Sequence, residues 1–224
     1  MTRLPNVLVL ALDTATPAST ATLAEVTADG MRGIAERRTV DARAHGELLA
    51  PEVSALLDEA GVRPRDLGAI VAGLGPGPFT GLRVGLATAA SMGQALGIPT
   101  YGVGSLDAIG RAAGPGRILV ATDARRREVY YATYQDGKRV GEPDVAKPAD
   151  IVVAADRAVG EGALKYSDVF GLPIDEILLF PPGAALVALA AERIRSRAPG
   201  ESLTPLYLRR PDAVESAVRK PVLQ

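Results

Sequence analysis

The chain has 224 residues, of which 47% are hydrophobic and 23% are charged, and its formal net charge is −1. A chain of this size and composition can bury a substantial core, and its near-neutral charge excludes a general electrostatic attraction to nucleic acid. It contains no cysteine and one histidine, so it lacks the side chains for disulfides, thiol nucleophiles and two-histidine metal sites. We therefore predict no metal site.

The N-terminal sequence MTRLPNVLVLALDTAT contains an apolar run that is shorter than a signal sequence requires. No stretch of the chain is long and apolar enough to span a bilayer. The absence of cysteine is typical of a reducing compartment. These features predict a cytoplasmic protein that does not associate with membranes.

The first part of the chain predicts three antiparallel strands followed by a helix. Residues 7–12 form an apolar run, residues 20–26 alternate between apolar and polar, and an Asp-Gly turn leads into residues 33–40. Residues 45–60 carry apolar side chains at helical spacing, and Pro51 should mark a start or a kink in this helix.

The glycine-rich stretch from residue 69 to residue 99 predicts a strand, a sharp turn and a helix. Residues 69–72 are a short apolar run, residues 81–96 have helical composition, and Thr80 is placed to cap the helix. A glycine-rich turn before a helix suggests phosphate binding. However, Gly81 is followed by Leu82 and not by the lysine of a P-loop, which favours a structural turn.

Small residues recur at every fourth position of the helix predicted for residues 81–96. This glycine ridge consists of Gly81, Gly85, Ala89 and Gly93, with Leu82 and Leu86 beside it. Each glycine costs about 1 kcal/mol of helix stability relative to alanine, so the ridge indicates close approach of another element, inside the chain or between chains. We expect an intermolecular interface, formed together with His45, Leu48 and Leu49 of the preceding helix.

A Gly-Pro-Gly break at residues 114–116 predicts a boundary between two lobes, residues 1–113 and residues 114–224. Just before this break, residues 100–103 predict a strand, and Ser105 predicts the cap of a helix that extends to Ala112.

The second half begins as the first does. Residues 118–122 form an apolar run that ends in Asp123, as the first run ends in Asp13, and residues 129–134 alternate as a return strand before a second Asp-Gly turn. This repeat predicts a duplicated lobe. The rest predicts a short strand or helix within 143–156, mostly loop over 161–173, an amphipathic helix at 184–195 and an extended segment at 205–211.

The candidate nucleotide-binding residues are Asp13, Thr14 and Asp123, because carboxylates at strand ends often hold Mg²⁺ through water in phosphate sites. The favoured alternative is that these side chains form turns by hydrogen bonding to the backbone. His45 is expected at a surface or an interface and not in catalysis. The arginines at 125–127 could meet phosphate or form a solvated hairpin tip.

A strand hairpin ending in aspartate, a helical layer and an apparent second copy suggest the duplicated actin-like and Hsp70-ATPase fold, an α/β fold with two lobes, each a mixed sheet with flanking helices. Five segments resemble the bacterial TsaB (YeaZ) family in order and spacing. They are ALDTAT at 11–16, AHGELLAP at 44–51, GLGPGPFTGLRVG at 73–85, DARRREVYYATY at 123–134 and PLYLRR at 205–210. Two departures, Pro78 in place of serine and Gly46 in a His-Ser-Glu motif, affect only hydroxyl roles at those positions.

The resemblance implies a non-catalytic partner of the paralogue TsaD in transfer of the threonylcarbamoyl group to adenosine 37 of tRNAs that read ANN codons. It also implies contact with the ATPase TsaE, contact with tRNA through the complex, and a homodimer when TsaD is absent. No catalytic residue and no tightly bound cofactor are implied, with ATP and Mg²⁺ entering through the partners. The alternative is an independent nucleotide-dependent phosphotransferase of the same fold, while a peptidase is disfavoured because metal ligands are missing.

Overall fold

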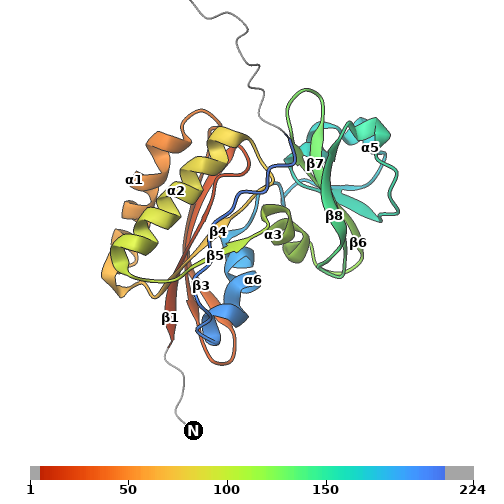
Figure 1. Ribbon diagram of the computed structural model, residues 1–224. Coiled ribbons are helices and arrows are strands. Elements are labelled where there is room, and N and C mark those ends of the chain that lie inside the picture. Colours follow the sequence, from red (N-terminus) through yellow and green to blue (C-terminus); the bar gives the residue numbers. More distant parts are fainter. Residues whose placement is uncertain (1–5, 210–224) are drawn as a thin grey trace, which may run out of the picture.

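The computed structural model describes residues 6–209, which form two five-stranded mixed sheets with flanking helices. Figure 1 shows the two sheets in separate lobes, with α1 and α2 on the outer side of the first lobe. The elements of the first lobe's sheet are β1 (Val7–Asp13), β2 (Ala18–Val26), β3 (Met31–Val40), β4 (Ala69–Gly73) and β5 (Thr100–Val103). Those of the second are β6 (Arg117–Asp123), β7 (Val129–Gln135), β8 (Lys138–Ala146), β9 (Arg157–Val159) and β10 (Ile174–Asp175).

The two sheets have the same topology, which confirms the predicted duplication. The first has the order β3-β2-β1-β4-β5 and the second the order β10-β9-β6-β7-β8, which is the same order read from the other edge. In each, the first strand pairs antiparallel with the second and parallel with the fourth. Asp13 and Asp123 therefore occupy the same place, at the end of the central strand of each sheet.

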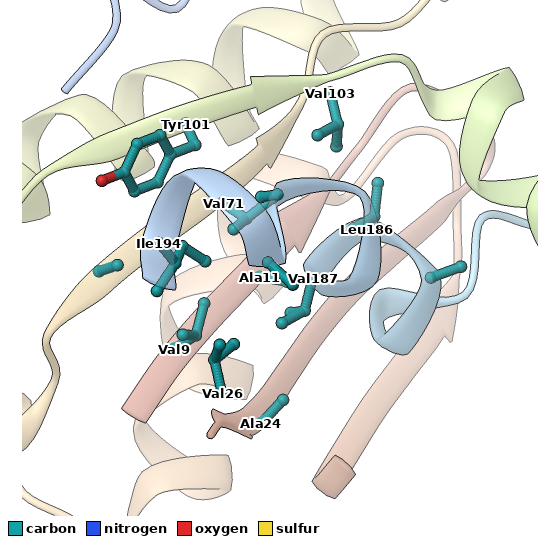
Figure 2. Close-up of a cluster of buried hydrophobic side chains, with 14 of the residues drawn as sticks. Val9, Ala11, Ala24, Val26, Val71, Tyr101, Val103, Leu186, Val187 and Ile194 are labelled. Carbon is teal, nitrogen blue, oxygen red and sulfur yellow. The ribbon is translucent and has the colours of Figure 1, made fainter. Parts of the chain in front are cut away.

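Three helices sandwich the first sheet. On one face lie α1 (His45–Glu59) and α2 (Phe79–Leu96), whose apolar residues join Leu10, Leu12 and Ile70 in one core cluster. On the other face lies α6 (Gly183–Arg195). Figure 2 shows this second cluster, in which Leu186, Val187 and Ile194 of α6 lie over strand residues such as Val9, Ala11 and Val71. Successive side chains of a strand point to opposite faces, so the continuous apolar run of β1 contributes to the cores on both sides of the sheet.

The lobes exchange helices across the predicted boundary at residue 113. The helix α3 (Ser105–Ala112) follows the first sheet in sequence but packs on the second, where Leu106 and Ile109 join the cluster that contains Tyr134. A Cβ at Gly110 would lie 2.3 Å from the Tyr134 ring, so α3 sits directly on β7. Conversely, α6 follows the second sheet and packs on the first. The second sheet and its helix α3 therefore come from one continuous stretch of chain, whereas the first sheet needs the distant helix α6 to complete its core.

Several local predictions are wrong. Thr80 lies inside α2, whose N-cap is Pro78, and Ser105 is the first residue of α3 and caps nothing. Pro51 lies inside α1 on its exposed side, so it does not mark the start of this helix. The edge strand β8 was not foreseen, and the region expected to be loop holds two short helices, α4 (Glu161–Lys165) and α5 (Ser167–Phe170). Two 3₁₀ turns, η1 (Pro64–Asp66) and η2 (Pro148–Asp150), complete the described elements.

No helix within residues 6–209 is long and apolar enough to cross a membrane. The last predicted segment is only partly described, since its residues 210 and 211 lie outside that range. Residues 201–209 run as a C-terminal strap across the first lobe toward the second. Glu201 N donates to Thr100 O at 2.8 Å, Leu206 N to Leu74 O at 2.8 Å, and Arg209 Nη1 to Ala124 O at 2.7 Å. The strap therefore joins the two lobes by hydrogen bonds.

Candidate functional site

The first hairpin turn holds two of the predicted nucleotide-binding residues, and both are buried in internal hydrogen bonds. Asp13 is fully buried, its Oδ2 accepting from Ser105 Oγ at 2.6 Å and its Oδ1 from Ala15 N at 2.9 Å. Thr14 Oγ1 donates to Gly81 O at 2.7 Å and accepts from Gly85 N at 3.1 Å. Only the bond from Ala15 N to Asp13 Oδ1 is the turn contact that the favoured alternative predicts, and the other three tie the turn to α2 and α3.

The glycine turn before α2 lies directly on this hairpin turn and seals it. A Cβ at Gly73 would lie 1.8 Å from Asp13 Oδ2, and a Cβ at Gly77 would lie 2.2 Å from Ala15 O. Only glycine permits such close approach of two backbones. Burial raises the pKa of Asp13 to about 6, although the hydrogen bonds from Ser105 and Ala15 oppose this rise. The first turn therefore has a structural role in the described fold.

The corresponding position of the second lobe is open. Asp123 Oδ2 accepts from Lys165 Nζ at 3.0 Å, and its backbone N donates to Glu161 Oε1 at 2.9 Å. Burial raises the pKa of Glu161 to about 7, against the hydrogen bond from Asp123 N. Asp123 Oδ1 is buried and has no hydrogen-bond partner within residues 6–209. Asp123 lines a cleft between the lobes, whereas Asp13 and Thr14 do not.

The glycine ridge of α2 packs inside the chain. A Cβ at Gly85 would lie 2.5 Å from Thr14 Oγ1, and a Cβ at Gly93 would lie 2.5 Å from Thr100 Cγ2. The ridge is thus buried against strand ends of its own sheet. Its expected part in an intermolecular interface stays a prediction. The leucines expected at the same interface, Leu49, Leu82 and Leu86, are also buried inside the chain.

His45, at the start of α1, is also mostly buried, and Leu48 is half-buried. The Nδ1 atom of His45 lies 2.8 Å from Ser19 Oγ. Burial lowers the pKa of His45, and Asp41 and Glu52 partly offset the shift. The imidazole is therefore held by β2 while it also lines the cleft. Within residues 6–209, no group of three or more His, Asp or Glu side chains is placed to hold a metal ion.

The sequence pattern did not distinguish the outer face of α1 and α2 from the glycine ridge of α2. It points away from the sheet (Figure 1) and consists largely of small, exposed residues. These residues are Gly46, Ala50, Ser54, Ala87, Ala90 and Ser91. Small side chains let the backbone of another helix come close. This outer helix face is covered by no other described element.

The cleft between the lobes has a volume of about 370 Å³. Residues of the first lobe, of the β6–β7 turn and of the C-terminal strap line it. Phe79 and Tyr207, each more than one-third exposed, meet at its mouth with ring centroids 5.1 Å apart. The Arg83 guanidinium lies 3.7 Å from the Phe79 ring centroid, a cation–π contact that fixes the pair.

Arginines concentrate around this cleft although the chain as a whole is nearly neutral. Those that line it are Arg43, Arg125, Arg126 and Arg209. Arg209 is paired with Glu128. Arg43 and Arg125 are exposed, and neither forms an ion pair or a side-chain hydrogen bond within residues 6–209. The cleft mouth thus combines an aromatic pair with a local excess of positive charge.

Comparisons with known proteins agree with this architecture. A family model described as tRNA N6-adenosine threonylcarbamoyltransferase (TsaD) matches residues 32–203. An uncharacterized protein of Mycobacterium leprae is 49% identical over 92% of the chain, which spans only 56% of that relative. The tRNA threonylcarbamoyladenosine biosynthesis protein TsaB of Escherichia coli is 36% identical over 57% of the chain and 54% of its own length.

The solved structure of YeaZ from Pseudomonas aeruginosa superposes on 90% of the chain and 100% of its own length, with a TM-score of 0.76 and 30% identity. The duplicated sheets and the shared helix layers define a two-lobed protein of the actin-like ATPase fold. Within that class, the chain belongs to the TsaB (YeaZ) family of TsaD-type proteins.

Proposed function

We propose that this chain acts in the biosynthesis of N6-threonylcarbamoyladenosine in tRNA, as a non-catalytic partner of a TsaD-type transferase that modifies adenosine 37 of tRNAs reading ANN codons. The support for the pathway is the family and the name of the Escherichia coli relative. The observation that supports a non-catalytic role is the sealed turn at Asp13, whose carboxylate is fully buried by the chain's own glycine turn.

The outer helix face is the surface we propose for the partner. Its small residues permit close packing of two more helices, and they are exposed while the glycine ridge is not. The same face would pair two copies of the chain when TsaD is absent. TsaE and tRNA would join through the complex, and ATP with Mg²⁺ would be bound by the partners. A scaffold of this kind raises activity by favouring one conformation of the enzyme it binds.

The independent phosphotransferase is less well supported. Such an enzyme would need free hydrogen-bond donors at both hairpin turns to hold phosphates. In the first turn, Ala15 N is already used by Asp13 Oδ1, and Gly77 covers the backbone. A calorimetric titration of the isolated chain with ATP and Mg²⁺ distinguishes the two functions, since only the phosphotransferase requires tight binding.

The decisive experiment reconstitutes tRNA modification from purified components, with and without this chain. Ala87→Arg places a long cation on the outer helix face, and we expect loss of pairing with TsaD and loss of modification while the fold persists. Ala184→Arg is the matched control, because Ala184 is an exposed alanine of α6, on the other side of the sheet. Full modification without the chain would refute the proposed requirement.

A further inference from the structure

We infer that the cleft mouth of this chain binds the sugar-phosphate backbone and one base of the tRNA, so that the chain contributes an RNA contact besides its partner surface. The inference rests on the proposed function for the identity of the RNA. The groups that carry it are the arginines Arg43 and Arg125 and the aromatic residue Tyr207, which line one cleft from three separate parts of the chain.

The charge argument begins with Arg43 and Arg125, which form no ion pair within residues 6–209. Arg43 precedes α1 in the first lobe and Arg125 lies in the β6–β7 turn of the second, so they reach the cleft from both sides. An exposed arginine without an ion pair among these residues is available to a phosphate, to which its planar guanidinium can donate two parallel hydrogen bonds. RNA phosphates are the ligands that such a pair would neutralise.

The aromatic argument concerns Tyr207, which is 37% exposed although it rests against Phe79. The strap holds it in place, because the neighbouring Leu206 N donates to Leu74 O. A ring fixed from one side and exposed at a positively charged cleft is the arrangement on which single-stranded bases stack. Sequence-specific contacts to RNA also favour unpaired bases in loops.

The structure favours an RNA strand over a free nucleotide. A mononucleotide enclosed between the lobes would place its phosphates against the hairpin turns, and the first of these is sealed by Gly77. Arg43, Arg125 and Tyr207 instead lie at exposed positions of the cleft mouth. Groups spread along an open mouth match a strand that crosses it.

The test measures binding of fluorescently labelled tRNA to the full chain by anisotropy, between about 50 and 200 mM KCl. The double variant Arg43→Glu with Arg125→Glu should weaken binding at least about tenfold and reduce the slope of log affinity against log salt by roughly 1.4, for two lost phosphate contacts. Tyr207→Ala should cost about tenfold, and Tyr207→Phe should retain the affinity, because stacking needs the ring and not the hydroxyl.

Arg127→Glu is the matched control. Arg127 is an exposed arginine of the same turn with the same left-handed backbone, φ 61° against 59° for Arg125, but it does not line the cleft. We expect less than about a twofold loss for it. Thermal melting of every variant should match the unmodified chain.

Three results would overturn the inference. They are no tRNA binding by the unmodified chain at the lowest salt, an equal loss in Arg127→Glu and the double variant, and displacement of tRNA by ATP as effective as by unlabelled tRNA. These failures differ from failure of the proposed function. Modification that requires the chain, with tRNA binding indifferent to the double variant, would leave the function standing and remove the RNA contact.

Discussion

The hairpin turns of the two lobes occupy the same place in sheets of the same order, yet one is closed and the other is open. At the first, Asp13 is fully buried, and both its oxygens accept hydrogen bonds within the chain. At the second, Asp123 is partly exposed, lines the cleft and pairs with an exposed lysine. Duplication therefore preserved the strands while the surroundings of the turns diverged.

The difference arises from the segment that comes after the fourth strand of each sheet. After β4 come the glycine turn and the 18-residue α2, whose glycine ridge allows the helix to lie on Thr14. After β9 comes α4, which has only five residues. A Cβ at Gly162 of α4 would lie 2.7 Å from Thr122 C, so this helix also packs closely, but it is too short to cover the turn beyond Asp123. The difference in length between α2 and α4 thus explains why the turn at Asp13 is buried and the turn at Asp123 lies at the surface.

The largest effect should come from opening the closed turn with Gly85→Leu. A single added Cβ would already lie 2.5 Å from Thr14 Oγ1, and Thr14 cannot move away without losing its hydrogen bonds to α2. We expect a loss of about 3 kcal/mol or more in the free energy of unfolding, seen as a melting temperature lower by roughly 6–12 °C.

Ala87→Leu on the same helix provides the control, because Ala87 is exposed. Its melting temperature should stay within a degree or two of the parent, while light scattering should show weaker association. A Gly85→Leu protein that melts normally but fails to associate would mean that the ridge is an intermolecular surface and that the turn is not sealed by it.

Replacing the buried carboxylate with Asp13→Asn should change the pH dependence of stability. The pKa of Asp13 rises from an ordinary 3.8 to about 6 on folding. The folded state thus binds this proton more tightly, and the stability that Asp13 contributes is fully present below about pH 4 and is lost as the pH rises through about 6. The shift corresponds to about 3 kcal/mol.

The amide has no such titration, and it can keep the hydrogen bond from Ala15 N. Urea unfolding of both proteins from about pH 4 to pH 7 should therefore show the variant gaining about 3 kcal/mol relative to the parent across that range. A constant difference at every pH would mean that the Asp13 carboxylate is solvated and the turn is open.

The two equivalent turns could be predicted from the sequence, because they rest on local patterns, but the contrast between them could not. The apolar runs that end in Asp13 and Asp123 marked the central strands, and their repetition indicated the duplication that the topology confirms. The glycine ridge indicated a close contact for α2. Its spacing could not tell whether the surface opposite was Thr14 of the same chain or another molecule.

The features that the sequence did not predict depend on contacts between distant residues. Ser105 has the residue type of a helix cap, but its hydroxyl bonds to Asp13, which is 92 positions away. The exchange of α3 and α6 between the sheets leaves no mark in either helix, since each has an ordinary apolar stripe. The meeting of Phe79 with Tyr207 at the cleft likewise exists only in the folded chain.

The smallest effect should come from Lys165→Met at the open turn. The pair of Lys165 with Asp123 is half-exposed on the lysine side, at 51%, so its contribution is limited by solvent screening to less than about 1 kcal/mol. Removing the cation should also raise the pKa of Glu161 further above its value of about 7, because Lys165 lowers that pKa.

The carboxyl carbon chemical shift of Glu161 in an NMR titration reports this pKa directly. The control Lys165→Arg should restore both the stability and the pKa. If Lys165→Met instead destabilised the chain as much as Gly85→Leu, the second turn would contribute as much to stability as the first. The contrast between a closed and an open turn would then not hold.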